Sequence, residues 1–305
     1  MKLDINDFEE ILGSKLSAES KKFVEETNFQ YELANSEQVN AGLIKFVNFL
    51  LEYKKESGPE YHEIWEQGWQ ENLNSYISSG DLIDLIPKFV RKKDLIRFGG
   101  GWISPEDPEF ETNFVTVLRD TIFRTNFKDS SSIWEFGSGT GLNLVHLSKI
   151  LPEKQLFGCD WAMPSVQILN ELNQKLNLKI RGFHFDLFQP EYEILNDITP
   201  SSGLFTIGTM EQIGHNYQLF LDFILASNFK RIVHIETNYE IYDETNLLDF
   251  LAKKYIEKRN WLRGYFSTLR ELEESGKIKI HQEKRTFGSF FHDGYTITVW
   301  ENLNV

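Results

Sequence analysis

Three glycines at alternate positions follow a short apolar run in the middle of the chain. Residues 133–136 read Ile-Trp-Glu-Phe, and residues 137–141 read Gly-Ser-Gly-Thr-Gly. The apolar run predicts a buried strand, and the residues that follow the glycines carry the apolar spacing of a helix. Glycine lets the backbone take positive φ and approach a ligand closely, while a helix N-terminus offers free N–H groups. The pattern therefore indicates a loop that binds a nucleotide-like ligand.

The spacing of the glycines separates two kinds of nucleotide-binding loop. A dinucleotide-binding loop follows the pattern G-x-G-x-x-G, with two residues before the third glycine. Here one residue precedes Gly141, and the acidic Glu135 lies two positions before Gly137. This arrangement resembles the first motif of the class I S-adenosylmethionine-dependent methyltransferases, E/D-x-G-x-G-x-G. A glycine-rich turn between any buried strand and helix can look similar. The later motifs therefore decide between a cofactor-binding loop and an ordinary turn.

The resemblance implies an α/β fold for residues 131–305, a little over half of the chain. The family has a Rossmann-like seven-stranded mixed sheet with helices on both faces and an antiparallel last strand. Beyond the strand at 133–136, apolar runs, alternation and turn signals indicate the further strands that this sheet needs. They are residues 155–160, 180–188, 203–208, 231–236, 277–281 and 295–300, the last two forming a hairpin-like pair.

The resemblance also implies S-adenosylmethionine as the cofactor and assigns residues to its parts. Asp160, about twenty residues beyond the glycine loop, would accept hydrogen bonds from the ribose hydroxyls, although a dehydrogenase carries an acid here as well. Asp186 would bond the adenine amine, and Glu135 would lie near the methionine ammonium. Trp161 would lie against the adenine or, equally, be a core aromatic residue. The predicted cofactor-binding residues are Glu135, Gly137, Ser138, Gly139, Asp160, Trp161, Asp186, Leu187, Gly208, Thr209 and Met210.

A general base is expected if the methyl acceptor is a hydroxyl, and three residues near the ends of the fourth and fifth strands are candidates. Histidine titrates near neutral pH, which favours His215 and His234. Glu236 could act as the base or hold a hydroxyl or ammonium group of the acceptor. A lone histidine is more often structural, and the position of His234 within a strand is typical of a buried, hydrogen-bonded side chain. His292, in the loop between the last two strands, is a further candidate.

No metal site is predicted. A metal-dependent O-methyltransferase would need Asp, Asn or Glu ligands grouped at the fourth and fifth strand ends. Glu211, Glu236 and Asn238 lie in that region, but their spacing matches no ligand pattern. The single cysteine, Cys159, excludes an internal disulfide and a cysteine-built metal site.

The composition disfavours several classes of partner. The 305 residues carry a formal net charge of -14, which repels phosphate backbones, so nucleic acid is not expected as the methyl acceptor. No apolar run is long enough to span a bilayer and the chain opens without a signal peptide, so we expect a cytoplasmic protein with no membrane association. One basic cluster is interpreted as a solvated helix face or as a contact for an anionic group on the substrate; it comprises Lys88, Arg91, Lys92, Lys93 and Arg97.

Residues 1–130 are expected to form a helical cap over the cleft of the central domain. A long apolar pattern follows Ser36, a good N-cap, and residues 60–79 place aromatic side chains at helical spacing. Aromatic residues at that spacing are more often core than binding site. Residues 98–105, with three successive glycines, predict a hinge or cofactor-contacting loop, or else a flexible connector. Residues 110–127 predict a helix that leads into the central domain.

The sequence is best interpreted as that of a methyltransferase that acts on an oxygen or nitrogen of a small molecule, for example a sugar or a natural product. A homodimer is compatible with this interpretation. A protein methyltransferase or a non-catalytic S-adenosylmethionine-binding partner protein, docking through the aromatic cap, is an alternative. An NAD(P)-dependent oxidoreductase is disfavoured by the single residue before Gly141 and by the antiparallel last strand.

Overall fold

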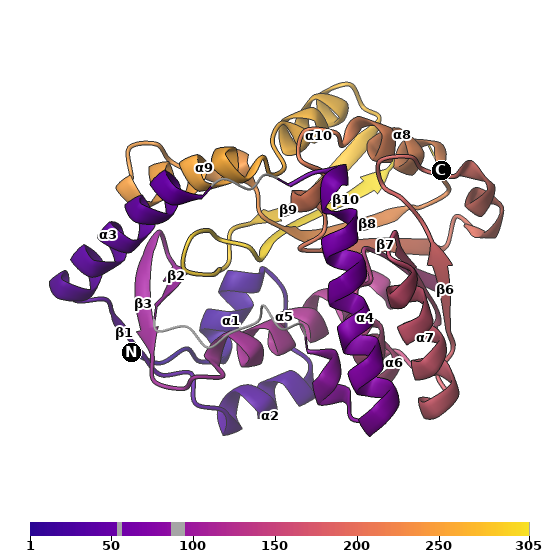
Figure 1. The fold of residues 1–305 in the computed structure, drawn as a ribbon, viewed down its shortest axis with the longest axis horizontal. Helices are drawn as coiled ribbons and strands as arrows, with labels where there is room; N and C mark the ends of the chain where they lie inside the picture. The colour runs from indigo at the N-terminus through magenta and orange to yellow at the C-terminus, as the bar shows by residue number, and fades with distance from the viewer. Residues whose placement is uncertain (54–56, 87–94, 305) are drawn as a thin grey trace.

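The computed structural model describes residues 1–53, 57–86 and 95–304. Its centre is a seven-stranded sheet in the order β6-β5-β4-β7-β8-β10-β9 (Figure 1). The strands from β6 to β8 are parallel, β10 runs antiparallel to β8, and β9 pairs antiparallel with β10. The predicted mixed sheet with an antiparallel last strand is confirmed. The bounds are β4 (Ser132–Phe136), β5 (Gln155–Asp160), β6 (Ile180–His184), β7 (Ser202–Ile207), β8 (Arg231–Glu236), β9 (Ile278–Lys284) and β10 (Thr296–Asn302).

The third strand of the parallel set, β6, is shorter than predicted. It ends at His184, and the chain then turns instead of continuing to residue 188. The Asp186 carboxylate accepts a hydrogen bond from the Phe188 N–H at 2.8 Å, and its carbonyl accepts one from the Gln189 N–H at 3.1 Å. An aspartate that bonds the backbone two residues ahead favours a turn over an extended strand.

Helices cover both faces of the large sheet (Figure 1). Successive strand residues point to opposite faces, so Ile133 packs in one hydrophobic cluster with α5, α6 and α7, and Trp134 packs in another with α8 and α10. Burial on both faces explains why the parallel strands appear as continuous apolar runs. The bounds are α5 (Phe110–Phe127), α6 (Leu142–Ile150), α7 (Met163–Leu176), α8 (Gln218–Ala226) and α10 (Tyr265–Glu274).

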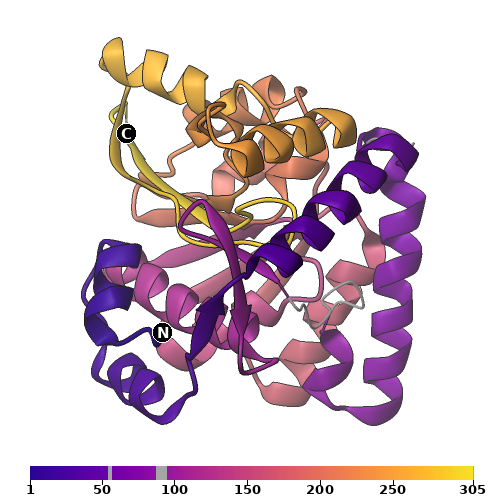
Figure 2. The same ribbon diagram turned by 90° about the vertical axis from the view of Figure 1, so that its left-hand side faces the viewer.

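The N-terminal segment contains a second, three-stranded sheet, so it is not helical throughout (Figure 2). The predicted loop at 98–105 is instead part of a β-hairpin. Gly99 and Gly100 take positive φ, 59° and 80°, and form the tight turn that joins its two antiparallel strands. The elements are α1 (Ile5–Leu12), α2 (Ala18–Glu26), β1 (Tyr31–Leu33), α3 (Ser36–Glu52), α4 (His62–Ser79), β2 (Ile96–Phe98) and β3 (Gly101–Pro105).

Two α-helices lie between β8 and β9, separated by a short break. Helix α9 (Leu247–Arg259) ends at Asn260, which is left-handed with φ 52°, and α10 begins after Gly264, with φ 86°. Helix α9 packs against α3 in a third hydrophobic cluster that also contains Trp102 of β3. Short 3-10 helices complete the elements: η1 (Pro59–Tyr61), η2 (Leu82–Leu85), η3 (Tyr192–Asp197), η4 (Met210–Ile213) and η5 (Tyr239–Ile241).

The basic cluster predicted around residues 88–97 does not form a solvated face at Arg97. This side chain is fully buried, forms an ion pair with Asp249, and donates to Asp293 at 3.0 Å and to the Leu248 carbonyl at 2.6 Å. Arg285 pairs with the same two aspartates at 2.6 and 3.0 Å. The other members, Lys88, Arg91, Lys92 and Lys93, lie outside the described residues.

The two halves of the chain share one hydrophobic core. Phe8, Phe29 and Phe114 from the N-terminal segment belong to the same buried cluster as Ile133 and Val233 of the large sheet. The proposed boundary at residue 130 therefore falls within a continuous core. Among the described helices, none has the length and apolarity needed to cross a membrane.

Candidate functional site

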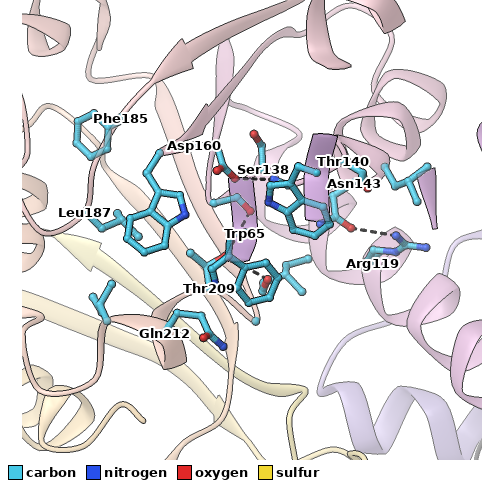
Figure 3. Close-up of a pocket in the computed structure, with 18 of the residues that line it drawn as sticks. Trp65, Arg119, Ser138, Thr140, Asn143, Asp160, Phe185, Leu187, Thr209 and Gln212 are labelled. Atoms are coloured by element: carbon cyan, nitrogen blue, oxygen red, sulfur yellow. Dashed lines mark hydrogen bonds between the residues drawn. The ribbon is translucent and has the colours of Figure 1, made fainter. Parts of the chain in front are cut away.

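A cleft of about 280 Å³ opens at the carboxyl ends of β4, β5 and β7 (Figure 3). Ligands of open α/β sheets bind at this edge, where helices leave the sheet in opposite directions. The structure brings together at the cleft eight of the residues predicted to bind the cofactor. They are Gly137, Ser138, Gly139, Asp160, Trp161, Leu187, Gly208 and Thr209.

The glycine loop lies at the centre of this cleft. The Gly137 N–H donates to the Cys159 carbonyl at 2.7 Å, which ties the loop to β5. Gly137 has φ 76°, and a Cβ placed on it would lie 2.2 Å from the Cγ2 of Thr209. Only glycine fits at this position, because the backbone is left-handed and the β7 end packs directly on it.

Asp160 joins the glycine loop to the following helix. Its Oδ2 accepts the Gly139 N–H at 2.8 Å and its Oδ1 accepts the Ala162 N–H at 2.9 Å. Burial raises the pKa of Asp160 to about 6, so the carboxylate is ionised at neutral pH. Each carboxylate oxygen can accept more than one hydrogen bond, so Asp160 can also receive a pair of hydroxyl groups from the cleft.

A polar chain that sequence analysis missed lies at the other end of the cleft. Arg119 of α5 donates to the Oδ1 of Asn143 at 2.9 Å, and the Asn143 amide donates to the Oε1 of Glu135 at 2.7 Å. Arg119 and Asn143 line the cleft, whereas Glu135 is buried behind them. The Glu135 Oε2 and the Arg119 Nε are buried without a hydrogen-bond partner among the described residues. Burial raises the pKa of Glu135 to about 8.

The remaining predicted cofactor residues lie off the cleft wall. Asp186 is half-buried in the turn after β6. Its carboxylate accepts a hydrogen bond from the Phe188 N–H, and the residue does not line the cleft. Met210 is fully buried in the second hydrophobic cluster. Phe185 and Phe188, next to Asp186 and Leu187, line the cleft with Trp161 and make that end aromatic.

Helix α4 of the N-terminal segment forms a wall of the cleft. Trp65 and Trp69 line it, and the Trp69 ring lies 3.2 Å from where a Cβ on Gly139 would stand. The aromatic spacing of this helix is visible in the sequence, where it favours core over binding site. The spacing alone does not identify Trp65 and Trp69 as cleft residues, because the packing of α4 against α7 decides which face of the helix meets the cleft.

The three predicted bases do not line the cleft. His215 is exposed at the surface. His234 is fully buried in β8, where its ring nitrogens contact the hydroxyls of Thr206 and Tyr265, each at 2.8 Å. Burial lowers the pKa of His234 to about 3, so the ring is neutral and enclosed.

Glu236 lies one hydrogen bond away from the cleft. Its Oε1 accepts the N–H of Thr209, a cleft residue, at 3.0 Å, and its Oε2 is buried without a partner among the described residues. Burial, with repulsion from Glu211, raises the pKa of Glu236 to about 8.

A second polar chain, also missed from the sequence, begins at Gln212 in the cleft wall. The Gln212 amide donates to Glu211 at 3.2 Å, and its Oε1 accepts from the Ser57 hydroxyl at 3.3 Å. Thr237 donates to Glu211 at 3.2 Å and contacts the Nδ1 of His292 at 3.0 Å. The loop histidine His292 thus lies behind the cleft, connected to it through this chain.

The strand order and the position of the cleft decide the fold. Five parallel strands are extended by an antiparallel β10 inserted between β8 and β9, and the glycine loop follows the central strand β4. The fold is that of the class I methyltransferases. The fold that the resemblance to this family predicted is therefore confirmed.

Comparisons with known proteins find several methyltransferases to which the chain is similar. No family model matches the chain. A tRNA (guanine-N(7)-)-methyltransferase of Vibrio vulnificus is 25% identical over 241 residues, which cover 75% of this chain and 95% of the relative. A geranyl diphosphate C-methyltransferase of Streptomyces coelicolor, solved with S-adenosylhomocysteine, is 12% identical, with a TM-score of 0.47 and coverage of 80% of this chain and 98% of that one. A Burkholderia thailandensis 1,6-didemethyltoxoflavin-N1-methyltransferase is 12% identical, with a TM-score of 0.44 and coverage of 61% and 77%.

Metal ions in proteins are usually held by His, Cys, Asp or Glu side chains that lie close together. No three His, Cys, Asp or Glu side chains of the described ranges are grouped so that they could hold an ion. The acids named as conceivable ligands, Glu211 and Glu236, are instead engaged with Thr237 and with the Thr209 backbone.

Proposed function

We propose that the protein is an S-adenosylmethionine-dependent methyltransferase that acts on an oxygen or nitrogen of a small molecule. One observation carries the proposal: a single cleft has Asp160 at one side and Arg119 with Asn143 at the other, with the glycine loop between them. These groups suit the two polar parts of the cofactor, a ribose diol and an amino acid.

The unpartnered groups at the Arg119 end fit the amino acid part. The buried Arg119 Nε lacks an acceptor and the buried Glu135 Oε2 lacks a donor among the described residues. A carboxylate beside Arg119 and an ammonium near Asn143 and Glu135 would supply what is missing. At the opposite end, the aromatic residues around Trp161 would pack on the adenine. Asp186 would then reach the adenine amine only if its turn moved.

The bound cofactor would supply a methyl group already activated by a sulfonium. The chain has to orient the acceptor and keep water away, which can provide about 7–11 kcal/mol of the barrier. Thr209 and Gln212 lie where the β7 end meets the cleft, and they would position the acceptor. Of the predicted bases, Glu236 is placed to hold Thr209, so we assign it a positioning role. His215 and His234 do not line the cleft, so we assign them no role in the transfer.

The acceptor class is supported by charge and by the shape of the cleft. The net charge of -14 opposes a polyanionic substrate, and α4 walls the cleft with Trp65 and Trp69. The similarity to a tRNA methyltransferase favours a second candidate, a purine base within nucleic acid. Methyl transfer from labelled cofactor to a small-molecule extract, and none to bulk tRNA, would separate the two.

The cofactor assignment is tested by calorimetry with S-adenosylhomocysteine. Asp160→Asn should weaken binding by about 10- to 100-fold, because it removes charge-assisted hydrogen bonds to the ribose and loosens the Gly139 loop. Asp186→Asn is the matched control, and it should have a smaller effect because its carboxylate bonds the Phe188 N–H off the cleft wall. Absence of binding to the wild type, together with quenching by NADH, would reject the proposal in favour of an oxidoreductase.

A further inference from the structure

Two indole rings of α4 line the cleft, and one of them, Trp69, packs against Gly139 of the glycine loop. Trp65 and Trp69 are one helical turn apart on α4, with ring centroids 5.4 Å apart and planes inclined by 32°. Both line the cleft. Figure 3 shows Trp65 near the middle of the site, with Asp160 toward one side and Arg119 toward the other.

Contacts with the methyltransferase part of the chain hold this helix in place. The Glu66 carboxylate accepts the N–H of Met163, the first residue of α7, at 3.1 Å. The His62 Nε2 contacts the Trp161 carbonyl at 3.0 Å, and the Lys175 ammonium donates to the Tyr76 carbonyl at 3.1 Å. The indoles are therefore fixed relative to Trp161 and to helix α7.

The charges of the cleft are confined to its two ends. Among the described residues that line it, Asp160 and Arg119 are the charged side chains, and the wall between them is aromatic, apolar or neutral. In S-adenosylmethionine the sulfur joins the ribose to the amino acid chain. With the ribose at Asp160 and the amino acid at Arg119, the sulfur would lie between them, in the part of the cleft where Figure 3 shows Trp65.

On the basis of the proposed function, we propose that Trp65, supported by Trp69, binds the positively charged sulfonium through its indole face and selects S-adenosylmethionine over S-adenosylhomocysteine. The face of an indole attracts a cation within about 6 Å, and the attraction is larger at a site shielded from water. The product carries a neutral thioether at the same position, so it loses this attraction. Trp65 is therefore a specificity-determining residue that favours the substrate form of the cofactor and the release of the product.

The test compares ligands that differ in charge at the sulfur position. Calorimetry measures the dissociation constants of S-adenosylmethionine, of sinefungin, which carries an ammonium near that position, and of neutral S-adenosylhomocysteine. Trp65→Leu should weaken binding of the two cations by roughly 5- to 30-fold more than that of the neutral ligand. Trp65→Phe, which keeps an aromatic face, should give an intermediate change in this ratio.

Trp161→Leu is the matched control. It makes the same substitution at the adenine end of the same cleft, and it should weaken all three ligands by similar factors. If Trp65→Leu also weakens all three equally, or leaves the ratio of affinities unchanged, the indole contributes only packing and the inference is wrong. Should Trp65→Leu fail to fold, an unchanged ratio in Trp65→Phe overturns the inference in the same way. Failure of the wild type to bind any of the three ligands would instead reject the proposed function.

Discussion

Buried carboxyl groups surround the cleft, and each is held by backbone or amide hydrogen bonds. Glu135, Asp160 and Glu236 are at most 5% exposed, and burial raises the pKa of all three. Their hydrogen bonds link β4 to α6, β5 to the glycine loop, and β8 to the β7 end. At the residue scale, the acids therefore assemble the loops of the cleft as well as offering charge to a ligand.

The raised pKa of Glu236 makes stability depend on pH. An unfolded glutamate ionises near 4.5, whereas Glu236 in the folded chain has a pKa of about 8, so the folded state holds an extra proton between these values. Stability therefore falls as the pH rises through this window. Below about pH 6.5 the depressed pKa values of His146 and His234 act in the opposite direction, so the fall is clearest from about pH 6.5 to 8.5.

Glu236→Gln keeps an acceptor for the Thr209 N–H and removes the titration. Over that window the wild type should lose up to about 1.4 kcal/mol more per pH unit than the variant, the cost of keeping one proton in the folded state. Urea unfolding at a series of pH values measures the two slopes. Parallel slopes would mean that Glu236 is already ionised in the folded chain.

At the scale of elements, a buried ion-pair cluster connects the small sheet to the C-terminal half. Arg97 comes from β2, Asp249 from α9, and Asp293 and Arg285 from the chain between β9 and β10. The phenol of Tyr242 also accepts the Asp293 N–H at 2.8 Å. Two cations thus balance two anions, which is the condition under which charges remain buried.

Arg97→Met should destabilise the protein by about 3–5 kcal/mol, because it leaves two buried carboxylates to share Arg285. Lys22→Met is the control, since it removes an exposed pair with Glu26 at 3.8 Å and should change stability little. Chemical denaturation of both variants gives the free energies of unfolding. Equal losses of unfolding free energy in the two variants would show that the buried ion pairs of Arg97 stabilise the protein no more than the exposed pair of Lys22.

At the scale of the whole molecule, the shared core predicts that the chain unfolds as one unit. Phenylalanines of α1 and α5 pack in the same cluster as strands β4 and β8, and α4 bonds to Trp161 in the cleft wall and to the start of α7. Calorimetry should show one transition whose calorimetric and van't Hoff enthalpies agree. Two separate transitions would support instead an independent N-terminal cap with a boundary at residue 130.

Much of the large sheet and of the glycine loop could be predicted from the sequence because both are local. Strand β4, the turn at Gly137 and the acid at Asp160 follow from periodicity, from backbone freedom and from one crossover length. Two shorter features were predicted wrongly, also for local reasons. The side chain of Asp186 ends β6 early, and the Gly99–Gly100 turn makes a hairpin where a loop was expected.

The sequence alone determined where the strands lie along the chain and which acids and glycines stand at their ends. Those patterns are set by neighbouring residues. The tertiary structure decided which side chains from distant helices reach the cleft. Arg119 and Trp65 come from α5 and α4, which meet the glycine loop only through packing, while His234, which has the right chemistry for a base, is enclosed by Thr206 and Tyr265. The direction in which a helix presents its side chains depends on the partners it packs against, and no local pattern records them.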